Sequence, residues 1–340
     1  MASLQAIRLS NSLISTTLSP GLVAVFVGGT SGIGEITLKQ FAKQADHPVC
    51  YIVGRSQEAT ERIVAECKTS NPDGRYIFIK GDVSLMTGVD KVCEEIMSKE
   101  DAVNLLFLTP IFPDFNRITA ENLHLIVALA YYARMLFVLR LMPLLTRAKS
   151  LSRVVDVGVG GGREGKIDPT DFQAMNLPLL SIRAHIATLN TLGLECLAVR
   201  APTVSFIHAY PGTVITPLLD HYSGILGVAL RTWLWLASRW LAIPLEESGE
   251  RNLFLSTSAR YPPSTGTKAS GVRLIEGMMV ARGTYGKTGG GVYSLNWDGE
   301  SLPENVGKLL ANYRDEGMLD KIWEDLESVF KRTTGKADSN

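Results

Sequence analysis

The chain has 340 residues, 46% of them hydrophobic and 20% charged, which is enough apolar material for a large core. Lys plus Arg and Asp plus Glu both number 34, so no net charge attracts nucleic acid or an acidic membrane surface. This balance favours a small molecule as the partner and argues against nucleic acid.

The first 20 residues contain no continuous apolar run of signal-peptide length, and we expect them to form a short helical arm. The four cysteines are scattered, with no CxxC pair and no histidine at metal-ligand spacing. This usage indicates reduced thiols, no metal site and a cytoplasmic protein. The cysteines are Cys50, Cys67, Cys93 and Cys196.

Apolar runs of strand length alternate with helical stretches along most of the chain, which predicts a parallel sheet covered by helices on both faces. The predicted fold is α/β, a Rossmann-type, doubly wound sheet of about seven strands. The strands are expected at 22–28, 49–53, 76–80, 103–108, 154–157, 204–208 and 292–295. The helices are expected at 32–45, 58–69, 87–99, 120–145 and 180–198, with one or two more within 305–332.

A glycine-rich turn follows the first predicted strand. Residues 27–34 read VGGTSGIG, directly after the apolar run and at the start of a predicted helix. Glycine lets the chain turn tightly and lets a diphosphate approach the backbone, and the free N–H groups of the helix N-terminus attract its charge. The turn predicts a dinucleotide site formed by Gly28, Thr30, Ser31, Gly32, Ile33 and Gly34.

This turn resembles the nucleotide-binding loop of the short-chain dehydrogenase/reductase family. Residues 81–84 (GDVS) are similar to the family's adenine-contacting segment, and residues 210–216 (YPGTVIT) are similar to its Pro-Gly turn. The resemblance spans residues 20–260, and residues 291–299 are most similar to fungal members found with secondary-metabolite pathways. It implies further cofactor contacts from Asp82, Val83, Pro211 and Gly212.

The end of the second predicted strand indicates which cofactor binds. NAD-selective sites usually carry an acidic residue there for the ribose 2′-hydroxyl, but this chain has Gly54 followed by Arg55. The guanidinium of arginine matches the oxygens of a 2′-phosphate. Arg55 therefore predicts NADP as the cofactor.

The groups that the family uses for catalysis are missing from their usual positions. The resemblance implies an Asn, a Ser and a Tyr-x-x-x-Lys pair, in which Tyr transfers the proton and Lys holds the nicotinamide ribose. Alignment of the helix at 180–198 places Arg183 at the Lys position and Leu179 at the Tyr position. Val159 stands at the Ser position and Ala130 at the Asn position. Leucine has no proton to give, and arginine stays protonated.

Other side chains near these positions are candidates for the chemistry. We expect Arg183 to bind ribose or an anionic substrate and Tyr210, before the Pro-Gly turn, to lie near the nicotinamide, so both are candidate catalytic residues. Arg134 shares a helix face with Ala130. His185 is expected in the core or at a subunit interface, and Asp156 is expected to point away from the site.

The most apolar part of the chain, residues 224–245, falls within the family's substrate-lid position at 217–245. On a helix its tryptophans Trp233 and Trp240 face one side, and Arg231 and Arg239 face the other. Two arginines argue against a membrane span. The segment would cover an apolar ligand, rest on a membrane surface or form a contact in a homo-oligomer.

These features predict an NADP(H)-dependent oxidoreductase that acts on a hydrophobic small molecule in secondary-metabolite biosynthesis. Two alternatives stay open: a cyclase or isomerase on the same scaffold, and a non-catalytic NADP-binding regulatory or scaffold protein. The expected organisation is an N-terminal arm (1–20), one domain (21–300) with an irregular insertion at 261–291, and a helical C-terminal extension (301–340).

Overall fold

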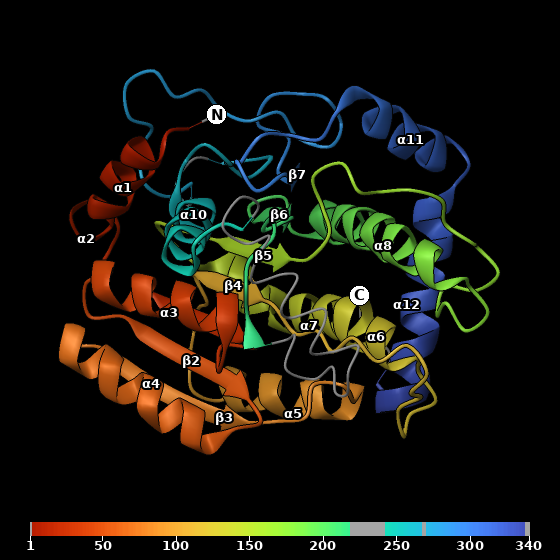
Figure 1. Cartoon of the computed structure of the whole chain (residues 1–340), viewed down its shortest axis with the longest axis horizontal. Coiled ribbons are helices and arrows are strands. Elements are labelled where there is room, and N and C mark those ends of the chain that lie inside the picture. The colour runs from red at the N-terminus through yellow and green to blue at the C-terminus, as the bar shows by residue number, and fades with distance from the viewer. Residues whose placement is uncertain (1, 218–241, 267–269, 337–340) are drawn as a thin grey trace.

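Seven parallel strands run through the middle of the molecule (Figure 1). The computed structural model describes residues 2–217, 242–266 and 270–336. Along the sheet the order is β3-β2-β1-β4-β5-β6-β7, and every neighbouring pair is parallel. This confirms the predicted doubly wound sheet. The strands are β1 (Val23–Val27), β2 (Val49–Gly54), β3 (Arg75–Lys80), β4 (Leu105–Leu108), β5 (Arg153–Val157), β6 (Ser205–Ala209) and β7 (Val292–Leu295).

One face of the sheet is covered by α3 (Gly32–Gln44), α4 (Gln57–Ser70) and α10 (Leu245–Thr257). Inner strands are buried on both faces, which is why their sequences are almost continuously apolar. The N-terminal helices α1 (Leu4–Ser12) and α2 (Ile14–Thr17) lie at the outer edge of this layer, where α1 packs on α10 (Figure 1).

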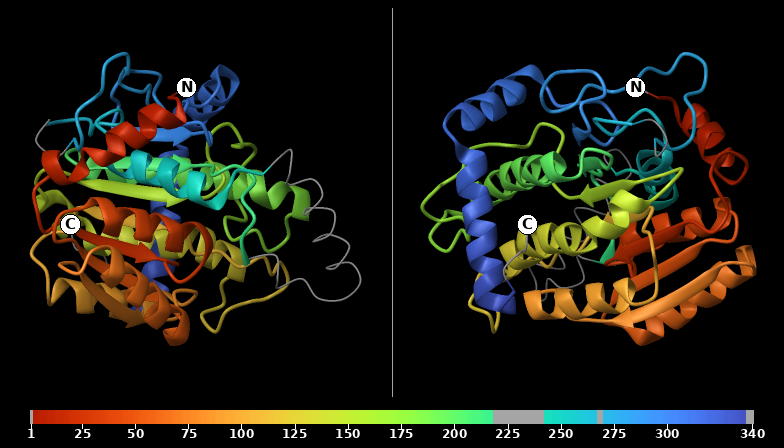
Figure 2. Two further views of the ribbon diagram at one scale, coloured as in Figure 1. Left: turned by 60° about the vertical axis from the view of Figure 1, so that its left-hand side comes forward. Right: turned by 180° about the vertical axis from the view of Figure 1, so that it is seen from behind.

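The opposite face is covered by α5 (Met86–Met97), α7 (Ala133–Arg147) and α8 (Leu179–Arg200). Two terminal helices, α11 (Glu304–Asp315) and α12 (Met318–Thr334), are separated by Gly317, whose φ of +70° suits glycine. Figure 2 shows α12 running across the ends of the helices on this face, where it packs against α8 and α5.

The long helix before β5 begins later than its sequence predicts. It starts at α6 (Leu125–Val127) instead of residue 120, because residues 119–123 form a turn with Asn122 at a φ of +57°. A π-helical turn, η1 (Ala128–Tyr132), then joins α6 to α7. The whole stretch Leu125–Arg147 is long and apolar enough to cross a membrane. However, 78% of its most apolar 18-residue segment is buried inside the protein, as in a core helix.

A fully buried arginine joins β5 to residues far along the chain. Arg153 donates hydrogen bonds to the carbonyl oxygens of Leu255, Ser258, Tyr261 and Ser270, at 2.6 to 3.0 Å. Burial lowers its pKa to about 10, so the guanidinium remains charged at neutral pH. It thereby fixes the start of the irregular segment 261–291 against the sheet.

Candidate active site

A cavity of about 710 Å³ lies at the carboxyl ends of the strands. Its walls come from the residues that follow β1 to β6 and from the helix faces of α7 and α8. This is the edge at which doubly wound sheets bind their ligands. Of the predicted site residues all but Tyr210 line it: Gly28, Thr30, Ser31, Gly32, Ile33, Gly34, Arg55, Asp82, Val83, Arg183, Pro211 and Gly212.

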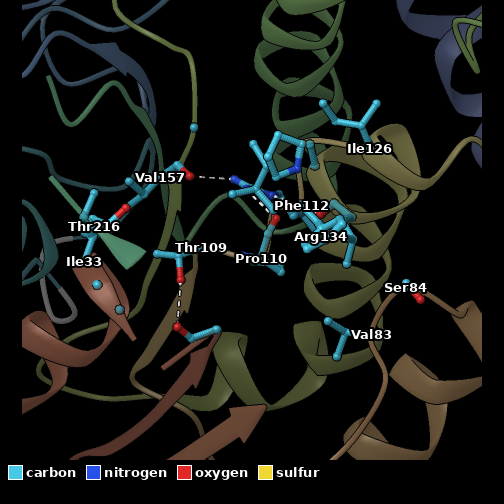
Figure 3. Close-up of a pocket in the computed structure, with 18 of the residues that line it drawn as sticks. Ile33, Val83, Ser84, Thr109, Pro110, Phe112, Ile126, Arg134, Val157 and Thr216 are labelled. Carbon is cyan, nitrogen blue, oxygen red and sulfur yellow. Dashed lines mark hydrogen bonds between the residues drawn. The ribbon is translucent and has the colours of Figure 1, made fainter. Parts of the chain in front are cut away.

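The glycine turn forms one end of the cavity and has no room for side chains. Gly28 and Gly32 have φ values of +81° and +55°, which favour glycine. A Cβ atom on Gly34 would approach the Gly28 carbonyl oxygen to 2.4 Å. The hydroxyl of Thr109, at the end of β4, donates to the carbonyl oxygens of Val27 and Gly28 and so fixes the turn (Figure 3). The backbone therefore fits a diphosphate above the N-terminus of α3.

Arg55 and Asp82 supply side chains to the same end of the cavity. Arg55 is exposed and lines the cavity, and it has no ion-pair partner in the described part of the chain. The carboxylate of Asp82 accepts hydrogen bonds from the backbone N–H and the hydroxyl of Ser84, at 3.0 and 2.6 Å. An unpaired guanidinium beside the glycine turn fits a ribose 2′-phosphate.

The four positions aligned with the family's catalytic groups all meet at this cavity. Leu179 and Arg183, one helical turn apart on α8, line it together with Val159 and Ala130. Leu179 is 61% exposed. Among the described residues that line the cavity there is no tyrosine, lysine, histidine or cysteine. Among the described lining residues, the side chains that can exchange a proton are therefore the hydroxyls and Asp82, which lies at the cofactor end, because arginine stays protonated.

Most of the rest of the wall is apolar, although Arg117 and Asn190 also line it. Phe112, Phe115, Leu125, Ile126, Leu129, Ile182 and Ile186 line the cavity from the loop after β4 and from the facing helices. Leu180, at the rim, is 96% exposed. A cavity with one polar end and a large apolar remainder suits a cofactor beside a hydrophobic molecule.

A buried arginine, Arg134, lies between these two parts of the cavity (Figure 3). It forms an ion pair with Asp156, and its N–H groups also bind the carbonyl oxygens of Val157 and Pro110, each at 2.8 Å. Arg134 thus ties the ends of β4 and β5 to the helix. Asp156 is not among the described residues that line the cavity, but its carboxylate points toward Arg134 on α7, which does line it, and not away from the site as expected.

Behind this wall, a buried polar network supports the loop that follows β5. Burial lowers the pKa of His208, against the raising effect of the Asp156 and Glu164 charges, so the imidazole is neutral at neutral pH. His208 contacts the Thr191 hydroxyl at 2.8 Å, and Thr191 donates to Glu164 at 3.0 Å. Glu164 also accepts from the Gly162 N–H and the Ser294 hydroxyl. The sequence interpretation did not single out this network.

Tyr210 lies next to the cavity but is not among the described residues that line it. Its ring is covered by the guanidinium of Arg163, with Cζ 3.5 Å from the ring centroid, and the Cζ atom of Arg183 lies 5.6 Å away. Burial raises the pKa of Tyr210, but the charge of Arg163 and hydrogen bonds with Thr213, Arg183 and Arg163 outweigh it and lower the pKa below its usual value.

His185 is buried in the core, which is one of the two placements expected for it. Its Nδ1 atom accepts from the Asp168 N–H at 3.2 Å, and its Nε2 atom lies 3.1 Å from the Phe172 carbonyl oxygen. Burial lowers its pKa. The lid segment falls mostly on residues 218–241, which lie outside the described residues, so the placement of Trp233 and Trp240 stays a prediction.

Sequence comparisons agree with this geometry. Residues 22–172 match the family description "short chain dehydrogenase". The chain is 40% identical to "Oxidoreductase AN1596" of Emericella nidulans over 334 residues, which cover 97% of this chain and 98% of the relative. It is also 40% identical to "Oxidoreductase andH" of Emericella variicolor, over 342 residues and 99% of each chain.

A structural comparison leads to the same fold. The L-sorbose reductase of Gluconobacter frateurii, solved with NADPH and L-sorbose, superposes with a TM-score of 0.53 at 18% identity, over 76% of this chain and 97% of that one. The chain belongs to the short-chain dehydrogenase/reductase family. The two relatives matched over their full length are both named as oxidoreductases and come from fungi of the genus Emericella.

Proposed function

We propose that this protein is an NADP(H)-dependent oxidoreductase that acts on a hydrophobic small molecule in fungal secondary metabolism. The observation that carries the cofactor assignment is Arg55, which has no ion-pair partner among the described residues and lines the cavity with a glycine turn that leaves no room for side chains. The glycine turn, Arg55 and the residues after β3 would hold the cofactor's phosphates and adenosine. When bound, the cofactor supplies or accepts a hydride.

Calorimetry with NADPH and NADH tests the assignment. We expect wild-type protein to bind NADPH at least about tenfold more tightly, which corresponds to about 1.4 kcal/mol. Arg55→Ala should remove most of this preference. The control is Arg75→Ala, which removes an exposed arginine from the neighbouring strand β3, outside the cavity. Equal affinities for the two cofactors, unchanged by Arg55→Ala, would refute the NADP assignment.

The remaining cavity favours an apolar substrate, since its walls are mainly aromatic and aliphatic side chains. Hydride transfer needs proximity between cofactor and substrate, so it does not depend on a tyrosine. The protein's own contribution is to exclude water, to hold the substrate against the cofactor and to supply polarising groups. Proton delivery then falls to water, to the substrate itself or to a hydroxyl of the wall.

A second candidate function, a cyclase or isomerase without net redox change, is favoured by Leu179 and Arg183 at the positions of the family's Tyr and Lys. An isotope experiment separates the two. The compound that accumulates in a host lacking the gene is incubated with protein and 4-deuterated NADPH. Deuterium in the product supports the oxidoreductase. A product that forms at full rate without cofactor turnover supports the second candidate. No conversion, with NADPH still bound, supports a regulatory or scaffold protein.

A further inference from the structure

Two arginines share one aromatic ring at the rim of the cavity. Arg163, in the loop between β5 and α8, and Arg183, in the second turn of α8, lie 3.5 and 5.6 Å from the centroid of the Tyr210 ring. Their guanidinium carbons are therefore no farther apart than the sum of these two distances. Two positive charges therefore lie near one ring. Of the two residues, Arg183 lines the cavity and Arg163 does not.

Neither arginine has an ion-pair partner in the part of the chain that the structure describes, although carboxylates are close in sequence. Glu164 directs its carboxylate to the hydroxyls of Thr191 and Ser294 and to the Gly162 N–H. Asp168 accepts from the N–H and hydroxyl of Thr170, at 2.9 and 2.7 Å. Because like charges repel, an anion that joins the two guanidinium groups would relieve their repulsion.

The two guanidinium groups are held in place before any ligand binds. The Tyr210 ring provides a shared surface for both: the Arg163 guanidinium stacks on it, and the Arg183 guanidinium lies within cation–π distance. The backbone beside Arg163 is fixed by the Gly161 N–H, which donates to the Ser294 hydroxyl at 2.7 Å. A preorganised pair of donors binds a carboxylate at a lower entropic cost than two free side chains would.

This cluster lies far from Arg55, the residue assigned to the cofactor's 2′-phosphate, although Pro211 and Gly212, which follow Tyr210, are among the predicted cofactor contacts. Arg55 follows β2, whereas Tyr210 follows β6, and β1, β4 and β5 lie between these two strands. Four strand spacings correspond to about 19 Å. The apolar wall, which includes Phe112, Phe115 and Ile126, faces the same cavity. An anionic group on a substrate that lies against this apolar wall would meet the cluster.

We propose that Arg163 and Arg183, stacked on Tyr210, bind the carboxylate of an otherwise apolar substrate. The inference rests on the proposed function, in which this cavity takes a hydrophobic small molecule beside NADP(H). It narrows the substrate class to carboxylic acids with a hydrocarbon or aromatic body. Tyr210 is then a positioning residue, which holds the two arginines and need not touch the substrate.

Equilibrium binding of a matched pair of probes tests the subsite. The full-length protein, with and without saturating NADP⁺, is titrated calorimetrically with 6-phenylhexanoate and with the neutral 6-phenylhexanamide. We expect the acid to bind about tenfold more tightly than the amide in both states. Arg163→Gln and Arg183→Gln should each lower this preference at least about threefold, and added salt should lower it further.

Three further variants separate the cluster from general charge effects. Lys166→Gln removes one positive charge from an exposed side chain of the same loop, and it should leave the preference unchanged. Tyr210→Phe keeps the ring and should retain most of the preference, whereas Tyr210→Leu removes the ring and should abolish it. For each variant, the preference for the acid over the amide is measured by probe binding. Its affinity for NADP⁺ shows that the variant is folded.

Three results would overturn the subsite: equal affinity for acid and amide, an equal loss in Lys166→Gln, or displacement of the acid by NADP⁺. The last result would place the carboxylate on the glycine turn. Failure of the proposed function is a separate outcome. A protein that does not bind NADP⁺ but still prefers the acid through Arg163 and Arg183 would contradict the cofactor assignment and support the subsite.

Discussion

Leu179 and Arg183 lie one helical turn apart on the face of α8 that lines the cavity. Neither can act as a proton donor near neutral pH. General acid-base catalysis contributes about 10²- to 10⁴-fold in rate, so simple ketones should be reduced slowly by the wild-type protein. We expect Leu179→Tyr combined with Arg183→Lys to raise NADPH-dependent reduction of acetophenone by up to about 10²-fold.

The control for this gain is Leu179→Phe combined with Arg183→Lys, which supplies the ring without the hydroxyl. Initial rates of NADPH oxidation, with the alcohol product measured by chromatography, provide the comparison. If the Phe variant gains as much as the Tyr variant, the missing phenol does not limit the rate, and the gain comes from the shape of the cavity.

Tyr210 offers a second prediction for a single residue. The charge of Arg163 and hydrogen bonds from Thr213, Arg183 and Arg163 lower its pKa, although burial opposes them. Arg163→Gln should therefore raise the pKa of Tyr210 toward its usual value near 10. Ultraviolet difference titration of the phenolate detects the change, and Tyr210→Phe identifies which part of the titration belongs to Tyr210. An unchanged titration in Arg163→Gln would show that the two side chains do not interact in solution.

At the scale of elements, the strands and the glycine turn could be predicted because their signals are local. Apolar runs and glycine spacing are visible within ten residues, and the cavity gathers the residues after them. The start of the helix at 125 was missed because Asn122 takes a left-handed conformation, which no apolar pattern reports. The contact between Arg163 and Tyr210 was also missed, since it joins distant parts of the sequence. The burial of Arg153 could have been predicted, because it is a charged residue within an otherwise apolar strand.

Helix α12 contains a partly buried carboxylate that should weaken the fold at neutral pH. Burial raises the pKa of Asp325 to about 6, against the lowering effects of its hydrogen bond from Tyr132, 2.8 Å long, and of the Arg332 charge. Its unfolded pKa is near 3.9, so the folded state binds the proton more tightly. The group therefore lowers the free energy of unfolding above about pH 6, and the effect disappears as the pH falls below about 4.

Asp325→Asn should stabilise the protein because the amide oxygen still accepts from Tyr132 and cannot ionise. We expect a gain of about 2 to 3 kcal/mol at pH 8 and almost none at pH 4. Urea unfolding at the two pH values measures it. Glu327→Gln, which removes an exposed charge from the same helix, is the control and should change stability by less than about 0.5 kcal/mol. A gain of equal size at both pH values would refute the ionisation argument.

At the scale of the whole molecule, α12 closes the layer of helices on one face of the sheet. It buries Met318, Ile322, Leu326, Val329 and Phe330 against this layer. Each such side chain contributes about 1.5 to 3 kcal/mol when fully buried. A chain ending at Gly317 should therefore lose most of its stability and expose apolar faces of α5 and α8.

Light scattering after size-exclusion chromatography measures the consequence of this truncation. We expect aggregates from the chain that ends at Gly317, and unchanged behaviour from a chain that ends at Thr334, which keeps all of α12. A well-folded protein without α12 would contradict the proposed packing role. A defined dimer would instead show that the uncovered faces associate with a second copy.

The buried Arg153 also bears on how a nascent chain folds as it leaves the ribosome. Its four carbonyl partners lie between residues 255 and 270, more than 100 positions later in the chain. Until they emerge, a guanidinium on the central strand β5 has no acceptor but water, and burying it would be costly. We therefore expect the sheet to close only after residue 270 has left the exit tunnel. Until then the first half of the protein depends on chaperones to cover its apolar edge.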